Sequence, residues 1–362
     1  MSVLGARSAV DRTAVRAVVD RVEEPQLRLP LGELGLVRDV SVDRRGGVRV
    51  RLAAVSTDPE PVQRLRAEVV SAVSGVPGAR RVEVETSALD GAGRQALGHR
   101  LRARHHRPGG LGERTAIYAV GSGKGGVGKS SITANLAAEL ARAGKRVGLL
   151  DADVWGYSVP QLFGLREAPA AVRGMMLPVE AHGVQLMSVG FFVSDEEPVV
   201  WRGPMLHKAL EQFLDDVYWG DLDVLLVDLP PGTGDVTLSV LELLPDAAMI
   251  VTTTPQVAAE QVAARVGRMA RDARMPVAGV VENMTGGPFG SGGGARLART
   301  LDASLLGQVP LDAALCAAGD AGRPLVLADP SAPSALALAE VARALPVMRR
   351  SLVGRSLPLA VT

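Results

Sequence analysis

The sequence is nearly free of cysteine and poor in aromatic residues. Its 362 residues include one cysteine, Cys316, which excludes an internal disulfide and suits a reducing compartment. Aromatic residues make up only 3%, so a hydrophobic core must be built mainly from Ala, Val and Leu. No apolar run reaches the about 18 residues of a membrane span, and the N-terminus lacks the apolar segment of a signal peptide. We therefore expect a soluble, cytoplasmic protein.

The sequence also lacks an excess of charge of either sign. Its 40 Lys and Arg and 39 Asp and Glu give a formal net charge of +1, which creates no global field to attract nucleic acid or an anionic membrane. We expect neither as a partner. The length exceeds what a single hydrophobic core usually organises, so two domains are expected.

The first part of the sequence, residues 1–90, has the pattern of a small α+β domain. An apolar helical stripe occupies residues 11–23, and apolar and polar residues alternate over 40–52 around a two-glycine turn. A helix is expected at 59–74, and the alternation returns at 81–85. The predicted order is helix, strand, strand, helix, strand.

A basic, glycine-rich segment interrupted by proline, residues 91–113, is typical of a linker. Its arginines favour a solvated chain, with a local contact to an anion as the alternative. The adjacent His105 and His106 cannot point the same way on a regular element, so we expect no metal there. Residues 351–362 are assigned to a C-terminal tail.

Residues 114–350 repeat the order strand, loop, helix. Continuous apolar strands alternating with helices predict a parallel sheet that is buried on both faces. We therefore predict an α/β fold, with a doubly wound, mostly parallel sheet preceded by the small α+β domain. The apolar runs expected to form strands are 117–120, 147–150, 184–189, 224–227, 249–252, 277–281 and 305–306.

A glycine-rich loop lies between the first of these strands and the next helix. It contains G-x4-G-K-S, the P-loop pattern, in the strand-to-helix context that the motif requires. The glycines let backbone N–H groups surround a phosphate, Lys129 neutralises the β and γ oxygens, and Ser130 can ligate Mg²⁺. This predicts an ATPase that uses ATP and Mg²⁺. The expected nucleotide-binding residues in the loop are Gly121, Ser122, Gly123, Lys124, Gly125, Gly126, Val127, Gly128, Lys129, Ser130 and Ser131.

Aspartates follow two of the predicted strands. Asp151 and Asp153 lie just past a strand end, where ligands bind in open α/β sheets, and Asp153 is well placed to orient an attacking water. Either could instead cap the next helix. Asp228 ends an apolar strand, which is the Walker B arrangement that holds Mg²⁺. The following turn, residues 229–235, is expected to sense the γ-phosphate, with a purely structural loop as the alternative.

The additional Lys124 inside the loop resembles the deviant Walker A ATPases, which include MinD and ParA. The resemblance implies a homodimer around ATP in which Lys124 reaches the partner's phosphates; the alternative is a lysine that points to solvent. It also implies that Asp153 is the catalytic aspartate of the first switch and that Asp151 lies near the metal. The expected catalytic residues are thus Lys124, Lys129 and Asp153, and the expected metal site is Ser130, Asp151 and Asp228.

Longer segments resemble a narrower group, the Mrp (ApbC) family of ATPases that carry iron–sulfur clusters to apoproteins. They read KGGVGKSS, LLDADVWGYSVPQLFG, WRGPM, LLVDLPPGTGDVTLSV, TTPQ, GVVENM, FGSGGGARLA and GQVPLDAALCAAGDAGRPLV. In the first domain, LPLGELGLV and GVPGA resemble the iron–sulfur cluster assembly (FSCA) domain. The resemblance implies that Asn283 contacts adenine, although it could instead cap its own loop. It also implies an iron–sulfur cluster as cargo, with apoprotein clients or iron–sulfur scaffold proteins as partners.

The sequence departs from this family where a cluster would be held. Cluster-carrying members place Cys-x-x-Cys shortly after the ENM segment, whereas residues 285–294 read TGGPFGSGGG. A cluster usually needs four thiolates, and a dimer of this chain owns two cysteines. We expect Cys316 to be a buried, inert thiol on an apolar helical face. A positioning or partition ATPase of the MinD and ParA kind, or a regulatory ATPase scaffold, remains the alternative function.

Overall fold

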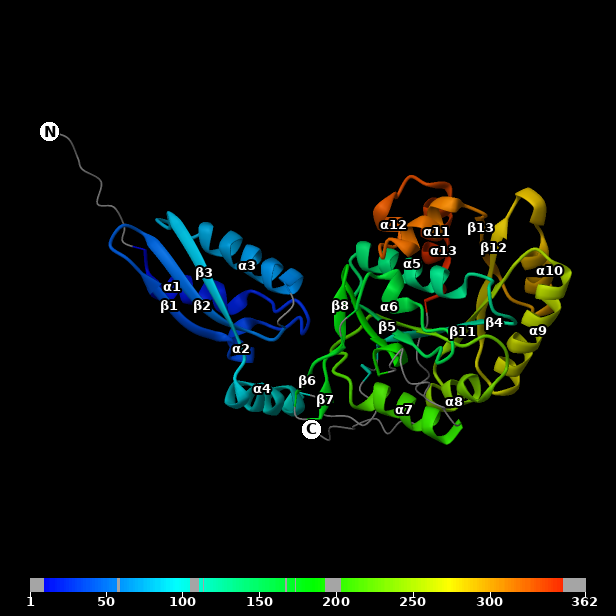
Figure 1. The fold of residues 1–362 in the computed structure, drawn as a ribbon, viewed down its shortest axis with the longest axis horizontal. Coiled ribbons are helices and arrows are strands. Elements are labelled where there is room, and N and C mark those ends of the chain that lie inside the picture. The colour runs from blue at the N-terminus through cyan, green and yellow to red at the C-terminus, as the bar shows by residue number, and fades with distance from the viewer. Residues whose placement is uncertain are drawn as a thin grey trace, which may run out of the picture. The chain divides into compact units, whose positions relative to one another are not determined.

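The computed structural model describes residues 10–56, 59–104, 111, 112, 114–166, 168–172, 174–192 and 203–347. The chain divides into two compact units (Figure 1). The N-terminal unit takes in residues 1–110, 169–180 and 216–220. The larger unit takes in residues 111–168, 181–215 and 221–362.

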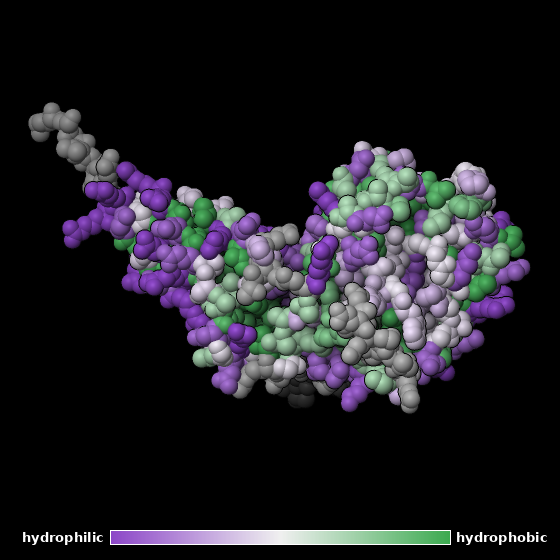
Figure 2. Space-filling model, in the orientation of Figure 1, coloured by the Kyte–Doolittle hydropathy of each residue, from purple (hydrophilic) through white to green (hydrophobic). Residues whose placement is uncertain are grey.

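The N-terminal unit is built on a three-stranded sheet in the order β1-β2-β3, with β1 antiparallel and β3 parallel to β2. In β2, Val48 and Val50 are buried while Arg49 between them is exposed, as the alternation of the sequence predicts. Arg49 pairs with Glu83 across the exposed face, and Figure 2 shows hydrophilic residues over much of the outer surface of this unit. The predicted order of helices and strands is confirmed, with the one-turn helix α2 in addition. The elements are α1 (Arg12–Arg21), α2 (Leu31–Leu34), β1 (Val37–Val42), β2 (Gly47–Ala54), α3 (Pro59–Ser74) and β3 (Arg81–Ala88).

The prediction of a linker over residues 91–113 was wrong for its first part, which is the helix α4 (Gly91–Arg104). Leu97 and Leu101, one turn apart, are buried in the same hydrophobic cluster as Val50. The glycines and arginines lower the intrinsic helix propensity of this segment, and tertiary packing overrides that weak preference. His105 and His106 lie outside the described residues.

Two short segments from later in the chain complete the N-terminal unit. Residues 169–180 and 216–220 bring Met175, Leu177 and Tyr218 into its core, together with the two-residue strands β6 (Ala171–Val172) and β7 (Met175–Met176). Glu180 is almost fully buried and forms an ion pair with Arg64 of α3. The chain therefore returns twice to a unit for which the sequence predicted a boundary at residue 90.

The larger unit contains an eight-stranded sheet in the order β13-β12-β11-β4-β10-β5-β9-β8. The neighbours from β13 through β9 pair in parallel, and β4 lies between β10 and β11, where the strand order reverses. This confirms the predicted doubly wound, mostly parallel sheet. The strands are β4 (Ala116–Ser122), β5 (Val147–Asp151), β8 (Val179–Ala181), β9 (Val184–Ser188), β10 (Val224–Asp228), β11 (Ala248–Thr253), β12 (Val277–Thr285) and β13 (Leu305–Pro310).

Helices cover both faces of this sheet, which explains why every residue of β5, β10 and β11 is buried (Figure 1). Across the described ranges, no helix has the length and apolar character needed to cross a bilayer. The helices are α5 (Lys129–Arg142), α6 (Val159–Leu162), α7 (Gly203–Asp215), α8 (Asp235–Leu243), α9 (Val257–Asp272), α10 (Gly293–Thr300), α11 (Ala313–Asp320), α12 (Leu325–Ala328) and α13 (Pro333–Ala344).

Candidate nucleotide-binding site

The predicted P-loop connects the end of β4 to the start of α5, at the carboxyl edge of the parallel sheet. Gly126 and Gly128 have φ angles of +76° and +80°, a left-handed conformation that glycine adopts without strain. A Cβ atom on Gly128 would lie 2.2 Å from Asn283 Nδ2. Glycine at this position thus permits both the turn and the close approach of Asn283.

The loop is hydrogen-bonded to the turn that follows β10. Ser122 Oγ donates to the Lys124 carbonyl at 3.1 Å, within the loop. The Gly232 N–H donates to the Ser122 carbonyl at 2.8 Å. The P-loop and the predicted γ-phosphate sensor are therefore in direct contact.

A compact set of charged and hydroxyl groups lies at the start of α5. Lys129 Nζ and Ser130 Oγ each lie 2.6 Å from Asp228 Oδ2. Asp153 Oδ2 is 3.8 Å from Lys129 Nζ, and both side chains are nearly buried. The structure thus brings together four residues that the sequence predicted from three separate segments.

Asp151 lies directly opposite Asp228 in the pairing of β5 with β10, and its side chain is fully buried. It accepts hydrogen bonds from the Asp153 N–H at 3.1 Å and from Ser188 Oγ at 3.0 Å. Burial, reinforced by the neighbouring Asp228 carboxylate, raises the pKa of Asp151 to about 8. A cation beside Asp228 would oppose this rise and favour the ionised form of Asp151. A longer bond of 3.4 Å from the Val159 N–H shows that Asp151 also caps α6 in part.

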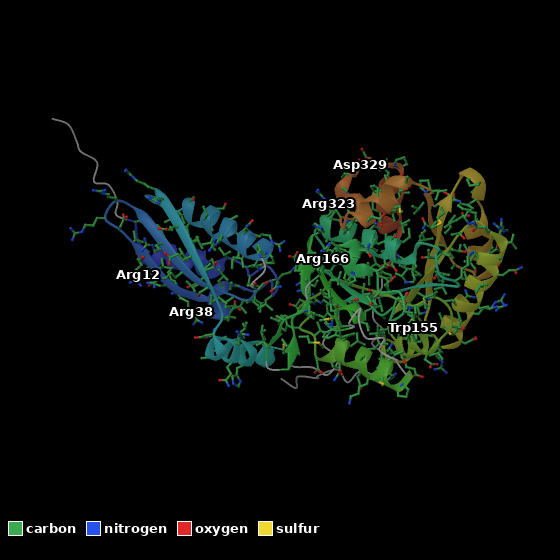
Figure 3. All side chains as sticks on the ribbon, in the orientation of Figure 1. Arg12, Arg38, Trp155, Arg166, Arg323 and Asp329 are labelled. Atoms are coloured by element: carbon green, nitrogen blue, oxygen red, sulfur yellow. The ribbon has the colours of Figure 1, made fainter. Side chains whose placement is uncertain are left out.

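Asp153 has a different set of partners. Its Oδ1 accepts from the N–H groups of Trp155 at 3.3 Å and Gly156 at 3.0 Å. These belong to a turn ahead of α6, whose N-cap is Ser158, so Asp153 is not the helix cap. Burial raises the pKa of Asp153, and the nearby Lys129 ammonium opposes that rise. Trp155, labelled in Figure 3, is 71% exposed on the same turn.

The oxygen atoms around Asp228 suit a small, hard cation. Mg²⁺ typically binds one or two carboxylates and completes its shell with water and substrate phosphates. Ser130 Oγ and Asp228 Oδ2 supply such a partial shell, with Asp151 on the adjacent strand. Within the described part of the chain, no group of three or more His, Cys, Asp or Glu side chains could hold a metal ion by itself. A cation here would complete its shell with water and with oxygen atoms of a bound nucleotide.

Two further predicted residues, Asn283 and Lys124, differ in their contacts with the P-loop. Asn283 Nδ2 donates to the Val127 carbonyl at 2.8 Å, so Asn283 bonds to the P-loop rather than capping its own loop. Asn283 Oδ1 is buried and has no hydrogen-bond partner among the described residues, which leaves it able to accept from an amino group such as that of adenine. Lys124 is exposed, and no described residue forms an ion pair with its ammonium.

Two residues near the aspartates were not predicted. Thr133 Oγ1 lies 2.7 Å from Asp228 Oδ1, and Ser188 donates to Asp151. Thr133 follows Lys129 by four residues, so it lies on the same face of α5, and this spacing was a readable signal. Ser188 reaches Asp151 only through the pairing of β9 with β5, and the sequence does not give that register.

The expectation of a buried Cys316 was wrong. Cys316 is exposed on α11, and its Sγ lies 3.8 Å from Asp320 Oδ2. The buried residue of this helix is Ala318, two positions on and therefore on a different face. The loop after β12 contains a tight turn in which the Gly286 N–H donates to the Gly290 carbonyl at 2.7 Å.

Both the N-terminal part and the larger part of the sequence match known protein families. Residues 113–346 match the family model for the ParA class described as NUBPL iron-transfer P-loop NTPase, and residues 12–86 match the model for iron-sulfur cluster assembly proteins. An iron-sulfur cluster carrier protein of Mycobacterium tuberculosis is 44% identical over 99% of each chain. The protein of the same name from Bacillus subtilis is 41% identical over 82% of this chain and 87% of its own.

Two solved structures are similar to this chain over part of its length. A nucleotide-binding protein from Archaeoglobus fulgidus in complex with ADP shares 36% identity, with a TM-score of 0.50, over 58% of this chain and 88% of that chain. MinD of Aquifex aeolicus shares 24% identity, with a TM-score of 0.50, over 68% and 99% of the two chains, which shows the fold alone. The chain therefore belongs to the family of iron-transfer P-loop NTPases related to ParA, with an N-terminal domain of the iron–sulfur cluster assembly type.

Proposed function

We propose that this protein hydrolyses ATP in order to deliver iron–sulfur clusters to apoproteins. Membership of a P-loop NTPase family supports nucleotide hydrolysis in general. The observation that carries the carrier role is 44% identity, over 99% of the chain, to proteins named iron-sulfur cluster carrier protein. Dependence on Mg²⁺ and a slow rate in isolation are part of the proposal.

The loop and the start of α5 bind the phosphates of ATP through backbone N–H groups and the positive end of the helix. In the proposal Lys129, whose ammonium lies 2.6 Å from Asp228 Oδ2, moves from that carboxylate to the β- and γ-phosphate oxygens when ATP binds. Ser130 and Asp228 hold Mg²⁺, which neutralises phosphate charge when it is bound.

Asp153 is proposed to orient the attacking water. Its Oδ1 is fixed by two backbone N–H groups, which leaves Oδ2, on the side of Lys129, to accept a hydrogen bond from that water. In the same proposal, Asn283 Oδ1 would accept from the adenine amino group, which favours ATP over GTP.

We further propose that the working form is a homodimer in which Lys124 reaches the partner's nucleotide. The exposed ammonium of Lys124 supports this, since no described residue pairs with it. Mixing Lys124→Ala protein with Asp153→Ala protein should produce hybrid dimers with one partly active site. Strictly monomeric protein at saturating ATP would refute the role in trans.

The cluster is the cargo in this proposal, and this chain cannot hold it alone. Two copies of Cys316 supply two thiolates, while a cluster usually needs four. The remaining ligands must come from an iron–sulfur scaffold protein, an apoprotein client or a small thiol. A cytoplasmic location suits such exposed thiol chemistry and is included in the proposal.

A positioning or partition function of the MinD and ParA kind has weaker support. The MinD structure shares 24% identity with this chain, which is evidence for the fold and not for the function. A regulatory ATPase scaffold remains a formal alternative, and it predicts that turnover depends entirely on a bound protein.

The hydrolysis proposal is tested by separating nucleotide binding from turnover. Lys129→Ala should lose binding, because the phosphates lose their main cation, whereas Asp153→Ala should keep binding and lose turnover. Asp272→Ala, an exposed site at the end of α9, is the matched control and should change neither. Equal loss of binding and turnover in Asp153→Ala would refute its role with water.

A further inference from the structure

A buried threonine contacts the carboxylate proposed to hold Mg²⁺. Thr133 lies in α5 and has no exposed surface. Its Oγ1 is 2.7 Å from Asp228 Oδ1 and 2.9 Å from the carbonyl oxygen of Lys129. A hydroxyl has one proton to donate, and a carboxylate is a stronger acceptor than a carbonyl, so the proton goes to Asp228.

The two oxygens of Asp228 face different partners. Oδ2 receives Lys129 Nζ and Ser130 Oγ, while the donor to Oδ1 within the described residues is Thr133. The plane of the carboxylate is therefore fixed by contacts on both oxygens. Asp228 is fully buried, so bulk water cannot replace a missing donor at Oδ1.

We infer that Thr133 is a positioning residue for the metal site: it holds Oδ1 of Asp228 so that Oδ2 keeps facing Ser130 when Lys129 leaves for the phosphates. The inference rests on the proposed role of Asp228 in binding Mg²⁺. Thr133 belongs neither to the P-loop pattern nor to the pattern of an apolar strand that ends in an aspartate.

If the Thr133 hydroxyl only stabilised the helix, a different result would be expected. A threonine that only bonds the carbonyl four residues earlier is common in helices and contributes little to them. Its loss would then leave the affinity for a metal unchanged. A group that orients a metal-binding carboxylate typically affects metal affinity about 10- to 100-fold when it is removed.

The test measures metal binding directly, with Mn²⁺ in place of Mg²⁺ and ADP as the nucleotide. Free Mn²⁺ is followed by electron paramagnetic resonance for the full-length protein, Thr133→Val and Thr133→Ser. Thr133→Val keeps the shape and removes the hydroxyl, so we expect about 10- to 100-fold weaker Mn²⁺ binding. Thr133→Ser keeps the donor and should restore most of the affinity. ADP affinity in EDTA should be unchanged in both variants.

Thr115→Val is the matched control. Thr115 is also buried, and its hydroxyl donates to the Leu222 carbonyl at 2.9 Å. It directly precedes the first residue of β4, whereas the P-loop follows the last residue of that strand. This variant makes the same chemical change and should leave Mn²⁺ affinity unchanged. If Thr133→Val does not fold, Thr133→Ala removes the same donor and carries the same expectation.

The possible results separate the inference from the function on which it rests. Wild-type affinity in Thr133→Val, or equal weakening in Thr133→Val and Thr133→Ser, would overturn the positioning role and leave Asp228 as the proposed ligand. Wild-type protein that binds ADP without any coupled binding of Mn²⁺ would overturn both. Restoration of kcat in Thr133→Val at saturating Mg²⁺ would support the inference, because only the metal affinity is then reduced.

Discussion

Glu24 in the N-terminal unit provides a quantitative prediction about stability. It lies between α1 and α2, it is 2% exposed, and its Oε2 accepts from the N–H groups of Gln26 at 2.9 Å and Leu27 at 2.7 Å. Burial raises the pKa of Glu24 from 4.5 to about 7. The two backbone bonds and Arg64 oppose this rise, while the Glu180 carboxylate adds to it.

The stability of the N-terminal unit depends on pH because the pKa of Glu24 differs between the folded and unfolded states. Below pH 4.5 Glu24 is protonated in both states, and above pH 7 it is ionised in both, so the free energy of unfolding falls between these values. At about 1.4 kcal/mol per pH unit, the difference between 4.5 and about 7 corresponds to a loss of about 3 kcal/mol. Glu24→Gln keeps an oxygen for both N–H donors and removes the charge. It should therefore stabilise the N-terminal unit at pH 8 and have little effect at pH 4.5.

The assay is hydrogen exchange of the β2 amides between pH 5 and pH 8, corrected for intrinsic rates, which reports opening of this unit alone. Glu83→Gln is the control, since Glu83 is half exposed and its surface pair with Arg49 contributes about 0–1 kcal/mol. Wild-type protection that does not change with pH, or a Glu24→Gln variant that is less protected at pH 8, would refute the reasoning.

Further predictions concern the loop and the thiol. Gly128→Ala should weaken ATP binding by at least about 10-fold, because the left-handed backbone costs roughly 1–2 kcal/mol and the new Cβ meets Asn283 Nδ2. Gly126→Ala, with a similar φ and open space around its Cβ, should lose less in the same fluorescent-nucleotide titration, and equal losses would contradict the packing argument. Cys316 should react rapidly with a thiol reagent in the native protein, because it is exposed, and Cys316→Ser should leave ATP hydrolysis unchanged. Slow labelling, or a loss of hydrolysis in Cys316→Ser, would count against this placement of the thiol.

The features that the sequence predicts correctly are defined by residues close together in the chain. The P-loop is a run of consecutive residues between a strand and a helix, so its pattern is visible in the sequence. Asp228 could be predicted because it directly follows the apolar residues of a strand. Alternation at Val48 and Val50 similarly predicted one buried face of β2. Each of these patterns spans only a few neighbouring residues of the sequence.

The predictions that were wrong, and the features that were not predicted, depend on contacts between segments far apart in the sequence. The helix α4 is stabilised by burying Leu97 and Leu101, and its propensity alone did not predict it. The return of residues 169–180 to the N-terminal unit leaves no periodic pattern because the strands there have two residues each. The exposure of Cys316 depends on which face of α11 packs, and an alanine-rich helix has too weak an apolar pattern to decide that.

We propose that this chain is an ATP-driven carrier whose cluster ligands come partly from another molecule. Anaerobic reconstitution of the purified protein with iron and sulfide, followed by counting chelator-resistant iron, tests it most directly. Because a dimer has two thiols in total, we expect clearly less than one [4Fe–4S] cluster per dimer for the protein alone. We expect retention to rise when a cysteine-rich scaffold protein is added with ATP. One full chelator-resistant cluster per dimer without a partner, abolished by Cys316→Ser, would contradict the claim.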